Sequence, residues 1–345
     1  MKTRIIAAAV LVPVLFLIVL VAPESAAAAI LGILLAIASY ELLYRTGLVK
    51  HPRLVVYSSV MAFALSMWSY FGAVRAYFLL MLMVYAMVLF AEMMLDHIKV
   101  HFETICMCFV SGVIIPYLLT SLIRILTMDI GRYVILIPFI VAFMSDAGAY
   151  FVGLKFGKHK LAPVVSPNKT IEGVFGGLAG ATIGMLIYTI ILDWPLKLDV
   201  SYVVALLYGV AGSAVGTFGD LCFSIIKRQT GIKDYGNLIP GHGGVLDRFD
   251  SLTMVAPLME ALLLILPLIR LYRGYIYGKM RHYSRLYRLH RPAEPGHYQP
   301  PAGNQGGGFN CGHQRGTYGG AVPGVSAGAG GHGNGRRREG TVPED

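Results

Sequence analysis

The stretch RYVILIPFIVAFMSDAGAYFV, residues 132–152, carries only two charged residues, Arg132 at its start and Asp146. A membrane-spanning helix needs roughly 20 mainly apolar residues to cross about 30 Å of hydrocarbon. The stretch therefore predicts a membrane span. Working outward, the same criterion finds further candidates at 5–22, 27–44, 54–71, 76–95, 104–123, 173–192, 202–222 and 252–271. The sequence thus predicts an all-α, polytopic integral membrane protein with about nine transmembrane helices, although two neighbours could merge or one could be re-entrant.

The composition agrees with this class. Of 345 residues, 56% are hydrophobic and 14% are charged, and the mean hydropathy is +0.63. Soluble domains usually carry about 25% charged residues. The composition therefore excludes an ordinary cytosolic enzyme, a disordered chain and a disulfide scaffold. The four cysteines show neither a CxxC pair nor a Cys/His metal spacing.

The orientation follows from Lys and Arg in the short loops, which are enriched on the cytoplasmic side. Basic residues precede the first candidate span and follow the second, sixth and eighth. We therefore expect a multi-pass protein of the cell membrane, with its N-terminus and its two longest inter-span loops in the cytoplasm. The first span could alternatively be a cleaved signal peptide, because an alanine-rich stretch follows it.

Ionisable side chains inside apolar segments are costly and usually functional. Asp146 and Asp220 are of this kind, and small neighbours on either side would allow a ligand or another helix to approach closely. Glu41, Glu92 and Glu260 lie near helix ends, where snorkelling or capping is the more ordinary explanation.

The first long loop contains SPNKTIEG, residues 166–173. Ser166 or Thr170 could cap the following helix by accepting hydrogen bonds from its first amides. Lys169 would then stand where a phosphate could meet the positive end of that helix. A plain basic loop is the simpler alternative.

The second long loop holds most of the remaining polar residues. Asp220, Ser224 and the Lys227–Arg228 pair are spaced to share one helical face. The sequence PGHGG, residues 240–244, can expose successive backbone amides to a phosphate. Asp247 and Asp250 follow, with Arg248 between them. Carboxylates near clustered cations are what a Mg²⁺–nucleotide site requires.

At this point the sequence resembles a known family. The segment from Ser224 to Asp250 is similar to the signature of the phosphatidate cytidylyltransferases, S-x-x-K-R-x4-K-D-x-G-x2-I-P-G-H-G-G-x-x-D-R-x-D, and meets every fixed position. Residues 145–150 and 166–173 also resemble motifs of that family. The resemblance implies an all-helical, homodimeric membrane enzyme that joins CTP and phosphatidic acid, giving CDP-diacylglycerol and pyrophosphate with Mg²⁺.

The resemblance also implies roles for individual residues. We expect metal ligands at Asp220 and Asp247, with Asp146 and Asp250 as further candidates. We expect phosphates to be held by Lys227, Arg228, Lys233, Arg248 and Lys169. Substrate contacts are expected from Ser166, Ser224, His242, Gly243 and Gly244. A monovalent cation could also take part, and membrane lipid is an expected partner.

Two other functions remain open from the residues alone. A CTP-dependent lipid kinase would use a similar architecture and the same nucleotide, and the unbroken signature favours the transferase over it. A secondary transporter would suit Asp146 and the glycine-interrupted spans. A transporter's polar residues should cluster at mid-membrane, however, whereas most here lie in the two loops.

The domain organisation follows from charge and glycine content. Residues 272–345 hold ten of the 29 Lys and Arg residues, and residues 292–345 hold 16 of the 40 glycines. We therefore expect a transmembrane cytidylyltransferase domain over 1–271, with N-terminal spans in 1–125 and catalytic spans and loops in 132–271. Residues 272–345 are expected to form a basic, Gly/Pro-rich disordered tail, either an extension or a frame-shifted end. No nucleic-acid partner is expected.

Overall fold

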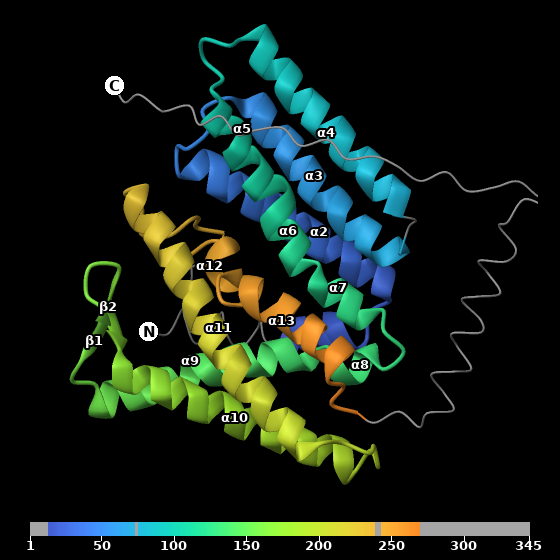
Figure 1. The fold of residues 1–345 in the computed structure, drawn as a ribbon, viewed down its shortest axis with the longest axis vertical. Helices are drawn as coiled ribbons and strands as arrows, with labels where there is room; N and C mark the ends of the chain where they lie inside the picture. The colour runs from blue at the N-terminus through green and yellow to red at the C-terminus, as the bar shows by residue number, and fades with distance from the viewer. Residues whose placement is uncertain (1–12, 73–74, 239–242, 270–345) are drawn as a thin grey trace, which may run out of the picture. The chain divides into compact units, whose positions relative to one another are not determined.

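The computed structural model describes residues 13–72, 75–238 and 243–269, and helices form most of this part of the chain. These residues all belong to one compact unit. Figure 1 shows the elements, which are α2 (Glu24–Tyr40), η1 (Glu41–Arg45), α3 (Pro52–Phe71), α4 (Arg75–Leu95), α5 (Phe102–Phe109), η2 (Val110–Ile114), α6 (Ile115–Leu119), α7 (Ser121–Leu126), α8 (Gly131–Val134), α9 (Leu136–Phe156), β1 (Lys160–Ala162), β2 (Ser166–Thr170), α10 (Ile171–Asp193), α11 (Tyr202–Gln229), α12 (Leu246–Phe249) and α13 (Leu252–Ile265). The elements η1 and η2 are π-helical turns. His242 and the predicted tail, residues 272–345, lie outside the described residues.

Within the described residues, seven helical segments are long and apolar enough to cross a membrane. They are Glu24–Arg45, Pro52–Phe71, Tyr77–Leu95, Phe102–Leu126, Gly131–Phe156, Ile171–Asp193 and Tyr202–Gln229. The all-α, polytopic class is therefore confirmed, whereas the count of about nine is not. Of the predicted span 5–22, the structure describes a helix over residues 13–20. The predicted span 252–271 is the 14-residue helix α13, which at 1.5 Å per residue covers only about 21 Å.

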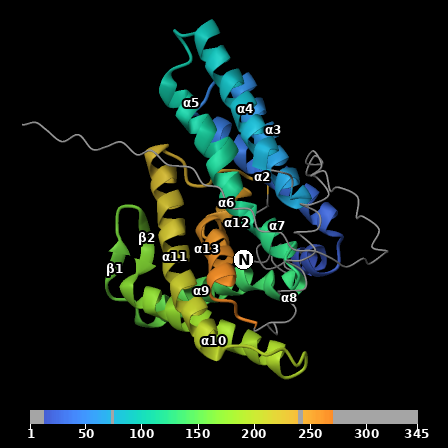
Figure 2. The same ribbon diagram turned by 45° about the vertical axis from the view of Figure 1, so that its right-hand side comes forward.

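Polar side chains join the N-terminal helices, which lie side by side in Figures 1 and 2. The Ser39 and Ser111 hydroxyls are 2.8 Å apart, which links α2 to η2. Ser58 on α3 hydrogen-bonds the Tyr85 hydroxyl on α4 at 2.9 Å. Lipid tails are as apolar as leucine, so hydrogen bonds of this kind and close packing hold such helices together.

Glycines bring α9 and α10 into close contact, and both figures show these helices running side by side. A Cβ atom added at Gly148 of α9 would collide with the backbone of Gly176. One added at Gly180 of α10 would lie 2.5 Å from the Met144 carbonyl oxygen. The prediction that small residues beside Asp146 allow another helix to approach closely is therefore confirmed.

Helices α11 and α13 are antiparallel neighbours. The Tyr208 hydroxyl near the start of α11 donates to the Leu266 carbonyl just after α13, at 2.8 Å. Val200 and Ile269 form an isolated β-bridge beside it. The end of α11, Gln229, lies at the opposite end of the α11–α13 pair, and the segment that leads to α12 begins there. The predicted second loop is therefore held at one end of this helix pair.

A charged pair fastens α13 to the N-terminal helices. Arg124 of α7 binds Glu260 of α13 through two parallel contacts, Nε to Oε1 at 2.7 Å and Nη2 to Oε2 at 2.8 Å. Both side chains are mostly buried. Glu260 was expected to snorkel or cap, and the structure instead gives it an arginine partner.

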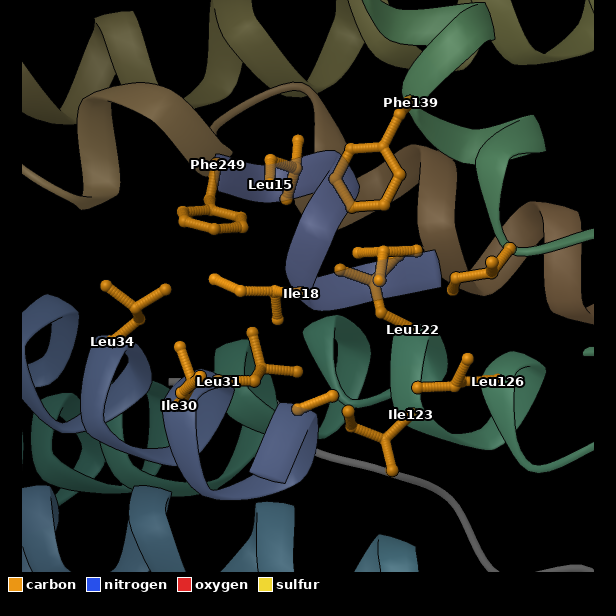
Figure 3. Close-up of a pocket in the computed structure, with 13 residues that line it drawn as sticks. Leu15, Ile18, Ile30, Leu31, Leu34, Leu122, Ile123, Leu126, Phe139 and Phe249 are labelled. Atoms are coloured by element: carbon orange, nitrogen blue, oxygen red, sulfur yellow. The ribbon is translucent and has the colours of Figure 1, made fainter. Parts of the chain in front are cut away.

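The core near the start of the described chain contains a small apolar cavity of about 70 Å³ (Figure 3). It is lined by residues of helix 13–20, α2, α7 and α9, and by Phe249 of α12. Every lining side chain is apolar. A charged phosphate would therefore find no polar partner in this cavity.

Candidate active site

The first predicted loop is a short β-hairpin that leads directly into α10. Strands β1 and β2 pair antiparallel, with Lys160 opposite Thr170 and Ala162 opposite Ser166. The Thr170 hydroxyl accepts a hydrogen bond from the Gly173 amide at 3.1 Å, so Thr170 caps α10. Of the two predicted capping residues, Thr170 fills this position. Glu172 in the first turn of α10 accepts from the amides of Lys158 and His159 and fixes the base of the hairpin.

Lys169 at the end of this hairpin forms an ion pair with Asp220 of α11. Both side chains are about one quarter exposed. The Ser224 hydroxyl, one turn further along α11, donates to the second oxygen of Asp220 at 3.3 Å. The predicted helical face that carries Asp220 and Ser224 is thus present. The first predicted loop thus meets α11 through the Lys169–Asp220 pair.

Two further carboxylates lie close enough to Asp220 for their charges to interact. Asp146 on α9 interacts with Asp220, Lys169 and Arg248. Asp250, in the turn between α12 and α13, interacts with Asp220 and Lys227. Burial raises the pKa of the Asp250 carboxyl well above its usual range, and the negative charge of Asp220 raises it further. The three aspartates therefore form one acidic cluster bordered by cations.

Asp247 is held differently from these three. Its side chain is only 3% exposed, and Lys227 donates to its Oδ1 at 3.0 Å. Its Oδ2 accepts from the backbone amides of Tyr235 at 2.8 Å and Gly244 at 2.9 Å. Asp247 thus ties together α11, the long loop and α12. Coordination of a metal by Asp247 would require some of these hydrogen bonds to be exchanged.

Tyr235 packs against the ion pair of Lys227 and Asp247. Its hydroxyl donates to the Phe223 carbonyl at 2.9 Å, and the Lys227 ammonium lies 5.4 Å from its ring centre. Burial raises the pKa of the Tyr235 phenol, with a smaller contribution from Asp247, so the hydroxyl stays protonated as a donor. Tyr235 therefore fixes the loop to α11 rather than serving as a base.

Glu41 is a residue of this region that the sequence reasoning did not assign to it. Its carboxylate, on η1 at the end of α2, accepts from the amides of Val245 at 3.1 Å and Leu246 at 3.0 Å. An acidic residue in an apolar helix was the available signal, and snorkelling or capping was the expected role. The sequence did not indicate that Glu41 would cap α12, a helix in the other half of the chain.

The remaining predicted residues lie at the rim of the region. Arg228 is exposed and its Nε donates to the Val165 carbonyl at 3.1 Å, so it contacts the hairpin. Lys233 and Arg248 are exposed, and Ser166 is half-buried on β2. Gly243 has a φ of +86°, which favours glycine, and the Gly244 amide already donates to Asp247. The roles assigned to these residues stay predictions.

The donor set suits a magnesium ion that is completed by substrate. Among residues 13–72, 75–238 and 243–269, no group of three His, Cys, Asp or Glu side chains is arranged to hold a metal. Mg²⁺, however, is usually bound through one or two carboxylates together with substrate phosphates and waters. Asp220, with Asp146 and Asp250 nearby, meets that requirement. Asp247 would do so only after its hydrogen bonds rearrange.

In the part of the chain that the structure describes, seven helices of membrane-spanning length and a cluster of aspartates and lysines that joins α9, α11 and the hairpin define a multi-pass membrane protein with a polar site. The chain belongs to the cytidylyltransferase family, whose model matches residues 2–266. The resemblance seen in the sequence is thereby confirmed.

Relatives of known name match a shorter part of the chain. The phosphatidate cytidylyltransferases of Staphylococcus saprophyticus and Staphylococcus aureus are each 45% identical to it over 134 residues, and that of Staphylococcus haemolyticus is 44% identical. Each match covers 39% of this chain and 50% of the relative. The chain therefore spans about half the length of the curated relatives it matches.

Proposed function

We propose that this protein transfers CMP from CTP to phosphatidic acid, giving CDP-diacylglycerol and pyrophosphate. The observation that carries the proposal is the family match, which extends across residues 2–266 and so includes both loops of the site. The names of the staphylococcal relatives indicate the same substrate.

The reaction is an in-line displacement at phosphorus. A phosphatidate oxygen attacks the α-phosphorus of CTP, and the bond from that phosphorus to the β-phosphate oxygen breaks, which releases pyrophosphate. The nucleophile is already an anion at neutral pH, so the site does not need a strong general base. Positioning and electrostatic stabilisation therefore supply most of the catalysis.

The cations of the site are suited to that task. Lys169 and Lys227 are each paired with an aspartate, which holds their ammonium groups in place before substrate binds. Arg228, Lys233 and Arg248 are exposed at the rim, where they can reach phosphate oxygens. We assign phosphate binding to these five residues and hydrogen bonding to Ser166, Ser224, His242, Gly243 and Gly244.

A magnesium ion, when bound, would neutralise phosphate charge and stabilise the leaving group. Asp220 is the first residue proposed to hold it, with Asp146 and Asp250 as neighbours. Asp247 remains in the proposed ligand set, and its hydrogen bonds to Lys227 and two amides give it a positioning task as well. A monovalent cation could share this acidic cluster.

The two substrates differ in where they dissolve, which limits where the site can lie. The lipid stays in the bilayer while CTP is soluble, so the phosphates must meet at the membrane surface. The basic loops favour the cytoplasmic surface for this site and for the N-terminus. We further propose that the protein acts in the cell membrane as a homodimer, as the family resemblance implies.

The decisive experiment uses the purified protein in detergent with CTP, phosphatidic acid and Mg²⁺. We expect pyrophosphate release, with label from [α-³²P]CTP entering the lipid and label from [γ-³²P]CTP remaining in pyrophosphate. Entry of the γ label into lipid would instead establish a CTP-dependent lipid kinase. Solute uptake by reconstituted vesicles without CTP consumption would establish a transporter.

A further inference from the structure

Glu41 and Asp247 together hold three consecutive backbone amides at the start of α12. The Gly244 amide donates to Asp247, and the amides of Val245 and Leu246 donate to Glu41. Glu41 comes from the N-terminal half of the chain and is only 3% exposed. Two buried carboxylates from distant parts of the sequence thus fix the segment that leads into Asp247, Arg248 and Asp250.

The loop is shaped around the Glu41 carboxylate. A Cβ atom added at Gly244 would lie 2.5 Å from both carboxylate oxygens, and one added at Gly236 would also collide with them. A side chain at either position would therefore displace the Glu41 carboxylate from the backbone amides that it binds. Glu41 lies in the π-helical turn η1, a feature that occurs frequently at functional sites.

We propose that Glu41 is a positioning residue for the transfer reaction, holding residues 244–246 at the start of α12 in their substrate-binding arrangement before CTP binds. The inference rests on the proposed function. Glu41 does not touch the reacting atoms in this assignment. It acts through the amides of Val245 and Leu246, which directly precede Asp247 and Arg248.

If Glu41 served stability alone, its replacement would lower the stability of the fold without a specific effect on CTP binding. Its loss would weaken the packing of α2 as a whole. The loss of a positioning residue would instead free the loop while the helices keep their contacts, and bound substrate would partly restore the order. The Michaelis constant for CTP should therefore rise more than kcat falls.

The test compares Glu41→Gln with Glu92→Gln. The first keeps the side-chain shape but replaces one acceptor oxygen with an NH₂ group, which cannot accept from a backbone amide. The control removes a carboxylate of α4 that accepts from the Tyr57 hydroxyl at 3.1 Å. For E41Q we expect the KM for CTP to rise about tenfold or more, the size expected for one lost charge-assisted hydrogen bond. For E92Q we expect values within about twofold of wild type, because Glu92 has no contact with the site and the glutamine oxygen can still accept from the Tyr57 hydroxyl.

Hydrogen–deuterium exchange of the same proteins supplies the second measurement. Peptides covering residues 243–250 should exchange faster in E41Q than in wild type, whereas peptides of α3 and α4 should not change. Gly236→Ala places a Cβ atom against the Glu41 carboxylate, so it should also raise the KM for CTP and speed exchange in residues 243–250. Unchanged KM and exchange in E41Q, or faster exchange spread over the N-terminal helices, would overturn the inference. Absence of activity in the wild type would count against the proposed function instead.

Discussion

Lys169 and Asp220 form an ion pair that joins the β1–β2 hairpin to helix α11. The hairpin and α11 are separated in the chain by the whole of α10, Ile171–Asp193. The pair brings Lys169, which is proposed to bind phosphate, beside the leading candidate for a metal ligand. Each charge keeps the other in place until phosphate or metal competes for it.

Replacing Lys169 with alanine should lower kcat/KM by about tenfold to a hundredfold, because hydrogen bonds to charged groups are worth about 1.5–3 kcal/mol. The matched control is Lys160→Ala, an exposed lysine on the partner strand of the same hairpin. Pyrophosphate release at varied CTP measures both. Equal effects of the two substitutions would remove Lys169 from the site.

Asp247 and Asp220 should respond differently to replacement by asparagine. Asp247→Asn should abolish turnover and also lower the Tm, because breaking a buried ion pair costs about 3–5 kcal/mol. Asp220→Asn should abolish turnover with a small change in Tm, since Asp220 is more exposed and has no amide partners described. Membrane insertion and thermal unfolding in detergent separate the two cases. Near-normal activity in Asp247→Asn would contradict the assignment.

The pair of Arg124 and Glu260 should stabilise the fold without taking part in the reaction. Arg124→Met leaves Glu260 as a buried, unpaired charge, so we expect a loss of about 3–5 kcal/mol in unfolding free energy. The double variant Arg124→Met with Glu260→Leu should regain part of this loss, because no charge is left unpaired. The protein that remains folded should keep its KM for CTP. A changed KM for CTP in a variant whose Tm equals that of wild type would show that the Arg124–Glu260 pair influences the site.

The helices were predictable from the sequence where an apolar run is uninterrupted. The expected span 173–192 is α10, Ile171–Asp193, and 76–95 is α4, Arg75–Leu95. The expected span 104–123 lies within the helical segment Phe102–Leu126, which is made of α5, η2, α6 and α7 and contains Pro116. Proline has no amide hydrogen for the helical ladder, which accounts for an irregular helix there. The span predicted to reach 271 ends at Ile265, after which the Leu266 carbonyl bonds Tyr208.

The site was predictable to the extent that its contacts are local. Asp220 and Ser224 share a face because they are four residues apart on a helix, and Thr170 caps the helix that follows it. The contacts from Lys169 to Asp220 and from Glu41 to Leu246 depend on tertiary packing. One sequence does not show which distant loops meet. The Gly244 amide was expected to be open to a phosphate. It instead donates to Asp247, and the next two amides donate to Glu41, because tertiary packing brings these carboxylates to the loop.

Deletion of residues 280–345 should leave activity within about twofold of the full chain, as expected for sequence outside the catalytic body. The family match ends at residue 266, and every residue placed in the site lies before it. The deleted segment holds eight basic and four acidic residues, so it carries +4 of the chain's net charge of +10, and its removal should also lower binding to anionic vesicles. The measurements are pyrophosphate release and vesicle co-sedimentation for the full chain and the truncated one. Loss of CMP transfer at normal Tm would show instead that the tail contributes to the catalytic body.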